Sequence, residues 1–220
     1  MRRLAPCLFA LVACGAPSGH AQPTAEPPRP TETEARAESR PAAPRCVAEP
    51  YRTHGTAVGC QALGFVAVLP GRGWSLRESV PGAPRVLLAA ELSPYLQMAV
   101  MARPPGDEPV DADAVLMDLY ARAAESARAR GHELTAPELG ESRPNRPTLT
   151  YEARDLVVDG QAYRSLHVWT TAQRPDGLRL AYHLSWTGPA ERVDPELALT
   201  MQATTAAFVL VDDDGRAIAD

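Results

Sequence analysis

Glu152, His167 and His183 have the residue types and the predicted spacing that suit a metal ion. Asp159-Gly160 is typical of a two-residue type I′ hairpin turn, which places Glu152 opposite His167. A second turn at residues 174–177 places His183 diagonal to His167. Cross-strand Cβ atoms lie about 5 Å apart and diagonal ones about 7–8 Å, so these side chains can converge on zinc. The alternative is a polar sheet face without a metal, on which Glu152 bonds to His167 and His183 packs on a tryptophan.

Motifs for enzymatic chemistry are missing from the sequence. No Gly-x-Ser-x-Gly elbow occurs, and a chain without lysine cannot supply a phosphate-binding P-loop. Gly71-Arg72-Gly73 is interpreted as a turn between strands, and Asp212–Asp214 as a solvated terminus that binds cations weakly at best. We therefore expect a protein that is not an enzyme and needs no cofactor. A hydrolase whose site assembles only in the folded chain stays as an alternative.

Cys46 and Cys60 are predicted to form a disulfide if the chain is exported. The closed loop of 15 residues would contribute about 3 kcal/mol in the chain-entropy description. The 13 residues between the two cysteines do not match the C-x-x-C spacing of redox or metal-binding pairs. Two free thiols are the other alternative.

The first residues indicate export. Met1-Arg2-Arg3 is a positive n-region, and Leu4–Ala13 is an apolar segment of secretory-signal length. The end of this segment, Leu11-Val12-Ala13-Cys14, resembles the lipobox of bacterial lipoproteins. That resemblance implies removal of residues 1–13, acylation of Cys14 with palmitate-like chains, and a membrane anchor facing the periplasm or the exterior. The alternative is an ordinary signal peptide cut after Ala21.

Residues 14–45 are predicted to be a disordered tether that follows the lipidated cysteine. Residues 15–45 contain seven Pro, four Glu and four Arg but no Leu, Ile, Val, Met or aromatic residue, so they cannot bury enough apolar surface to fold. Their reach would be about 95 Å as polyproline II, or about 30 Å as a random coil. A net charge of −5 provides no basic surface for nucleic acid, so that partner is excluded.

Alternating apolar residues and turn signals predict the elements of a globular domain at 46–211. A four-strand meander is expected over residues 65–69, 74–79, 85–92 and 96–103, followed by a helix at 111–130 and three long strands. The first long hairpin should pair Ala153 with Leu166 and Asp155 with Arg164, and the second should pair Val168 with Leu184. A final helix begins at Asp194-Pro195 and ends near residue 211, and residues 212–220 form a disordered acidic tail.

The order of these elements resembles that of the PsbP-like domain. The resemblance begins with the stretch Gly64–Trp74, in which an alternating strand is followed by Pro, Gly and Trp, and it covers residues 60–211. Lipoproteins of the DcrB and LpqN type are similar in joining a lipobox to such a domain. The resemblance implies an α+β fold, an α/β/α sandwich whose central antiparallel sheet is flanked by helices. It also implies a binding role without a shared catalytic site. Together with the lipobox and the tether, this predicts a domain that binds an envelope protein partner or assists the assembly of a membrane complex. The alternative is a lipoprotein that binds a metal or small ligand on the sheet face with Glu152, His167 and His183.

Overall fold

A computed structural model describes residues 46–78, 86–93, 95–103, 111–144, 146–193 and 195–218. All of them belong to one compact unit, Pro44–Asp220. The predicted signal segment, the lipidated Cys14 and the tether lie outside the described residues. No helix among the described residues is long and apolar enough to cross a membrane.

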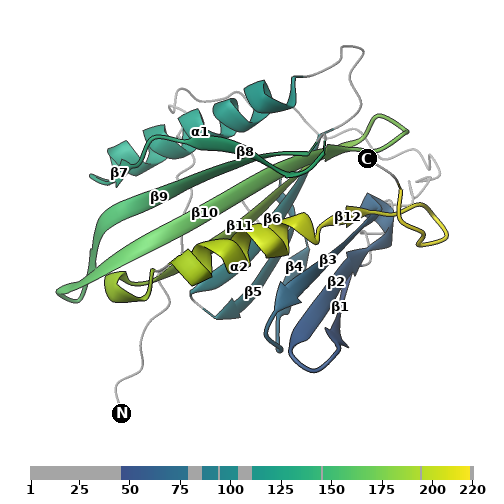
Figure 1. The fold of residues 1–220 in the computed structure, drawn as a ribbon, viewed down its shortest axis with the longest axis horizontal. Helices are drawn as coiled ribbons and strands as arrows, with labels where there is room; N and C mark the ends of the chain where they lie inside the picture. The colour runs from purple at the N-terminus through teal and green to yellow at the C-terminus, as the bar shows by residue number, and fades with distance from the viewer. Residues whose placement is uncertain are drawn as a thin grey trace, which may run out of the picture. The chain divides into compact units, whose positions relative to one another are not determined.

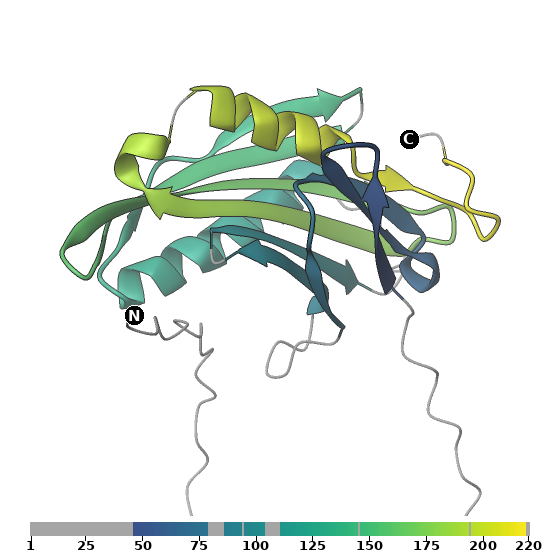
Figure 2. The same cartoon turned by 90° about the horizontal axis from the view of Figure 1, so that it is seen from below.

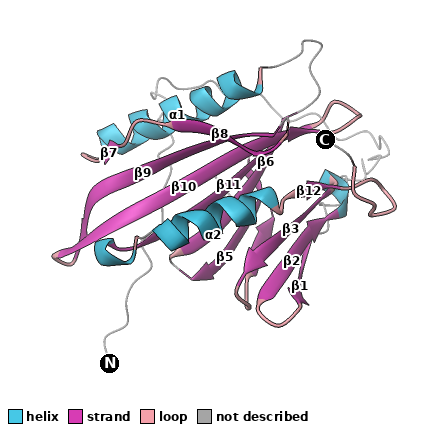
Figure 3. Ribbon diagram, viewed as in Figure 1, coloured by secondary structure: helices cyan, strands magenta, loops and turns pink. Residues whose placement is uncertain are grey.

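Two antiparallel sheets make up most of the fold (Figures 1 and 3). The smaller sheet has the order β1-β2-β3-β12. Its strands are β1 Cys46–Tyr51, β2 Gly55–Cys60, β3 Phe65–Pro70 and β12 Val209–Leu210. The larger sheet has the order β4-β5-β6-β11-β10-β9-β7, with β8 also paired to β9. Its strands are β4 Ser75–Glu78, β5 Val86–Ser93, β6 Leu96–Arg103, β7 Glu133–Leu134, β8 Glu138–Arg143, β9 Arg146–Val158, β10 Gln161–Gln173 and β11 Arg179–Pro189.

Two α-helices lie on opposite faces of the larger sheet (Figure 2). Helix α1, Ala112–Ala129, begins at the predicted cap, where the Asp111 carboxylate accepts from the Asp113 N–H. It ends in a Schellman motif: Gly131 adopts φ 76°, and the His132 N–H donates to the Ala127 carbonyl. Helix α2, Pro195–Ala206, begins at the predicted proline. Two short 3₁₀ helices, Gln61–Leu63 and Ala190–Arg192, complete the described elements.

Each face of the larger sheet supports its own apolar core. On the α2 face, side chains of β10 and β11 pack against α2 and the smaller sheet; the buried set includes Val58, Phe65, Leu166, Val168, Leu184, Met201 and Phe208. On the α1 face the buried cluster is much smaller and consists of Leu116, Leu149, Tyr151 and Trp169. Helix α1 therefore depends on far less buried apolar surface than α2 does.

The predicted register between β10 and β11 is confirmed. Val168 faces Leu184, and Trp169 faces His183. The turn at 174–177 has Gly177 at φ 83° and a hydrogen bond from its N–H to the Arg174 carbonyl. The Asp159-Gly160 turn is also confirmed, with φ of 52° and 80°, the signs of a type I′ turn.

The predicted register between β9 and β10 fails beyond the first residues of the hairpin. Leu156 faces Tyr163, in the register that the turn specifies, but a β-bulge then shifts the pairing before Ser165. Asp155, with φ 57°, lies in the bulge. Because β-strand side chains alternate between faces, one extra residue moves every side chain of β9 that precedes the bulge to the other face. Ala153 therefore pairs with Ser165 instead of Leu166.

Three further predictions are corrected. The strand at residues 65–69 joins the smaller sheet, so only β4, β5 and β6 form the meander in the larger one. The final helix ends at Ala206, and β12 follows it. The acidic tail is ordered through Ile218: the Asp212 N–H donates to the Arg216 carbonyl, and the Ile218 N–H donates to the Leu210 carbonyl. The carboxylate of Asp212 accepts backbone N–H groups of this turn, which gives it a local structural role.

The disulfide between Cys46 and Cys60 is confirmed. The two cysteines face each other across the β1–β2 pair. Cys60 is 1% exposed and belongs to the larger apolar core. The bridge therefore attaches the first described residue to that core.

We expect the Cys46→Ala/Cys60→Ala double variant to lose about 3 kcal/mol of unfolding free energy, because its unfolded chain is no longer cross-linked. Guanidinium titration would measure this loss. Reduction should lower the midpoint of the wild type and leave that of the double variant unchanged. An unchanged wild-type midpoint after complete reduction of the thiols would contradict the expectation.

We expect Asp155→Val to lower the free energy of unfolding by about 1–2 kcal/mol, because a β-branched residue is strained at positive φ. Asp155→Gly should be neutral or slightly stabilising, since glycine adopts this φ without strain. Gln161→Val, at an exposed strand position without positive φ, is the matched control. Equal losses for Asp155→Gly and Asp155→Val in a denaturant titration would rule out the backbone explanation.

Candidate functional site

His167 and His183 meet on the α1 face of the larger sheet, as the sequence predicted. His167 Nδ1 lies 3.1 Å from His183 Nε2, and the two rings are inclined by only 4°. His167 Nε2 lies 2.9 Å from the Ser165 hydroxyl. The hydroxyl in turn lies 2.7 Å from the Thr187 hydroxyl. A continuous chain of hydrogen bonds therefore runs across β10 and β11.

Aromatic rings enclose this histidine pair. Tyr151 stacks on His167 with ring centroids 4.7 Å apart, and Trp169 stacks on His183 at 4.0 Å. The Trp169 indole N–H donates to the Tyr151 hydroxyl at 3.3 Å. Tyr120 of α1 meets the Tyr151 ring edge to face, with centroids 5.3 Å apart. One part of the alternative is thus confirmed, the packing of His183 on a tryptophan, whereas the expected bond between Glu152 and His167 does not form.

The enclosure keeps both histidines neutral near pH 7. Burial lowers the pKa of His167 from 6.5 to about 4. Burial, and then the charge of neighbouring His167, hold the pKa of His183 well below 6.5. Burial also raises the pKa of Tyr151 to about 12, so this neighbour stays protonated and uncharged. A neutral pair satisfies the 3.1 Å contact with one N–H donor and one acceptor nitrogen.

Glu152 does not lie beside the histidines. The β-bulge pairs it with Leu166 and places Tyr151 opposite His167. On the α2 face its carboxylate accepts from the Arg164 guanidinium, and from Arg154 Nε at 3.1 Å. Within the described part of the chain, no three His, Cys, Asp or Glu residues are grouped to hold a metal ion. The predicted three-ligand site of Glu152, His167 and His183 therefore does not form.

The order Ser165–His167–His183 has the hydrogen-bond sequence of a nucleophile, a base and an orienting group. Ser165 is only 4% exposed, and its hydroxyl also contacts the Trp186 carbonyl oxygen at 3.2 Å. A base whose conjugate acid has a pKa of about 4 removes protons weakly at neutral pH. The geometry therefore favours a structural polar network beneath α1 over acyl transfer.

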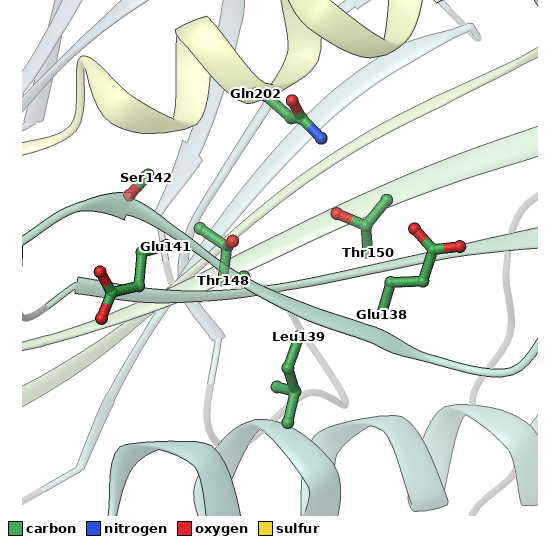
Figure 4. A pocket seen from close by; sticks show the side chains of 8 residues that line it. Glu138, Leu139, Glu141, Ser142, Thr148, Thr150 and Gln202 are labelled. Atoms are coloured by element: carbon green, nitrogen blue, oxygen red, sulfur yellow. The ribbon is translucent and has the colours of Figure 1, made fainter.

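A polar groove lies between β8, β9 and α2 (Figure 4). Its volume is about 150 Å³. Glu138 pairs with Thr150, and Gly140 with Thr148, so these residues share one face of the sheet. Figure 4 shows Gln202 reaching from α2 toward the side that carries both threonines. The groove was missed at the sequence level because Pro137 and Pro144, which flank β8, indicate a loop.

No protein-family model matches the chain, and no curated protein matches its sequence.

We expect acidification from pH 6.5 to pH 4 to destabilise the fold through the histidine pair. Between pH 6.5 and pH 4 the imidazole of His167 takes up a proton in the unfolded chain but not in the folded one. The free energy of unfolding therefore decreases as the pH is lowered. The lowered pKa of His167 alone decreases the free energy of unfolding by about 3 kcal/mol between pH 6.5 and pH 4. His183 acts in the same direction because its pKa is also lowered. Denaturant titrations across this range would measure the slope.

The His167→Asn/His183→Asn double variant should show a shallower pH slope than the wild type, whatever its absolute stability. His54→Gln, which removes an exposed histidine in a turn, is the matched control. Carboxylates contribute equally to all three proteins, so only the difference in slope is diagnostic. Identical slopes in the wild type and the double variant would refute the role of the pair.

Proposed function

We propose that this chain is a lipid-anchored protein of the cell envelope whose PsbP-like domain binds a protein partner. The observation that carries the proposal is the segment Leu11-Val12-Ala13-Cys14 at the end of an apolar run that follows Arg2 and Arg3. Acylation of Cys14 with more than one chain would hold the protein stably at a membrane. The Pro-rich residues 15–45 would then let the domain work at a distance from that membrane.

The disulfide supports an exported location. Structural disulfides persist in oxidising compartments such as the periplasm or the exterior, and are rare in the reducing cytosol. Cys46 and Cys60 are bridged, and no other cysteine belongs to the described residues. A mature chain beginning at Cys14 would keep just these two cysteines for pairing.

The arrangement of helices supports a PsbP-like α/β/α sandwich. An antiparallel sheet lies between α1 and α2, and the chain order of strands, helix, long strands and helix matches the resemblance. The smaller sheet and the early end of α2 are departures from the expected pattern.

Binding to a protein partner is favoured over a metal or small ligand at the histidine face. Glu152 and the two histidines lie on opposite faces, and the histidines already satisfy one another beneath α1. The groove beside α2 offers a polar surface for recognition instead.

Membrane fractionation of Cys14→Ala tests the anchor. The wild type should incorporate a labelled palmitate analogue and partition into the membrane fraction, whereas Cys14→Ala should do neither. Cys7→Ala is the matched control, because Cys7 lies within the segment that would be removed. Membrane retention and labelling of Cys14→Ala equal to those of the wild type would refute the lipid anchor.

Crosslinking in the native envelope tests the partner. A defined envelope protein should be captured by the wild type and by Cys7→Ala, and lost or strongly reduced with Cys14→Ala. Capture of the same protein at the same level by released Cys14→Ala would show that anchoring does not position the domain. No capture above background would contradict partner binding.

A further inference from the structure

Several polar side chains that line the groove between β8, β9 and α2 make no polar interaction with other described parts of the fold. Among the described residues, no hydrogen bond or ion pair engages the side chains of Glu138, Thr148, Thr150 or Gln202. Glu138 and Gln202 are exposed, and Thr148 and Thr150 are partly buried. The polar groups of the groove are thus available to an external ligand.

Gly140 is a second, independent feature of this groove. It lies inside β8, where glycine weakens a strand, and it does not belong to the residues with positive φ. A Cβ atom there would lie 3.4 Å from the Thr148 hydroxyl, so close packing does not exclude a side chain either. Strand glycines mark β-bulges as well as places where a ligand approaches closely, and the β8–β9 pairing shifts between Glu141 and Arg143. Here the missing side chain leaves the Thr148 hydroxyl open to the groove.

The lining narrows the chemistry of the ligand. No lining side chain is positively charged, which disfavours phosphates and carboxylates, and none is aromatic, which disfavours stacking of a sugar ring. The polar groups that remain are rich in acceptor oxygens: two carboxylates, three hydroxyls and one amide, from Glu138, Glu141, Ser142, Thr148, Thr150 and Gln202. They suit a cation with several N–H donors. A guanidinium group meets this description best, because its planar fork binds a carboxylate through two parallel hydrogen bonds.

We propose that this groove binds an arginine side chain of a partner protein, with the Glu138 carboxylate as its counter-charge. Thr150, directly across the β8–β9 ladder from Glu138, accepts a further N–H, and Gln202 closes the site from α2. A groove of about 150 Å³ accommodates the end of one such side chain rather than a folded element. The proposal rests on the proposed function in one respect, that the ligand belongs to a protein partner.

Titration of the full-length protein in non-ionic detergent with N-acetyl-arginine amide tests the site. Amide and side-chain NMR resonances of Thr148, Thr150 and Gln202 should shift in a saturable manner. N-acetyl-citrulline amide has nearly the same shape without the charge, and it should bind at least about fivefold more weakly. Equal shifts with both probes, or no saturable shift at these residues, would overturn the proposal.

Matched variants locate the binding. Glu138→Gln keeps the shape of the side chain and should weaken the arginine probe by about fivefold. Glu125→Gln makes the same charge change at an exposed position of α1 and should leave the affinity for the arginine probe unchanged. Gly140→Ala should also weaken binding, because its methyl group covers the Thr148 hydroxyl. Equal losses in Glu138→Gln and Glu125→Gln would show diffuse charge attraction and refute the site.

These outcomes are distinguishable from failure of the proposed function. Arginine binding at Glu138 does not require acylation of Cys14, so the titration stands even if the anchor experiment fails. An envelope partner whose crosslinking yield is equal with wild type and Glu138→Gln would place the partner interface elsewhere, and would remove the protein source of the arginine. Native near-UV circular dichroism of each variant would confirm that a lost affinity is not lost folding.

Discussion

The left-handed backbone at Asp155 determines which face of the larger sheet receives each preceding side chain of β9. Without the bulge, Tyr151 would face α2 and Glu152 would face α1. With it, Tyr151 joins the cluster beneath α1, and Glu152 meets Arg164 on the other face. The same shift places Thr148 and Thr150 on the α2 side, where they line the groove. The aromatic enclosure, the ion pair and the groove thus follow from one inserted residue.

The two helices are held to the sheet by different kinds of contact. Helix α2 packs on a large apolar core that also includes β2, β3 and the strand after the helix. Helix α1 covers a small apolar cluster. In this cluster, Tyr151 and Trp169 stack on the two hydrogen-bonded histidines. Local opening needs less free energy where fewer apolar contacts are lost. Opening of α1 therefore costs less free energy than opening of α2.

Much of the fold follows from short-range sequence signals. The turn at 174–177 fixed the β10–β11 pairing, because its backbone angles are specified through glycine. The cap at Asp111 and Gly131 located α1 for the same kind of reason. These signals also sufficed to bring His167 and His183 together.

The features that escaped prediction depend on contacts between distant residues. Asp155 carries no mark of its positive φ, so the bulge and the position of Glu152 could not be foreseen. Apolar residues continue past Ala206 and suggest more helix, but Val209 and Leu210 pair with β3. Ile218 packs against the core and its N–H donates to the Leu210 carbonyl, although it belongs to the segment predicted to be a disordered acidic tail. The groove depends on strand β8, and the prolines on either side of β8 indicate a loop rather than a strand.

The bridge between the first and second strands has a mechanical consequence. If the chain is anchored at Cys14 as proposed, any pull would reach the domain at Cys46, the first residue of β1. Antiparallel strands loaded at one end open one hydrogen bond at a time, so β1 on its own would peel away from β2 under tension. Because Cys46 is bonded to buried Cys60, the load passes directly to the start of β3 and into the core. The domain would thereby keep its shape while its tether is under strain.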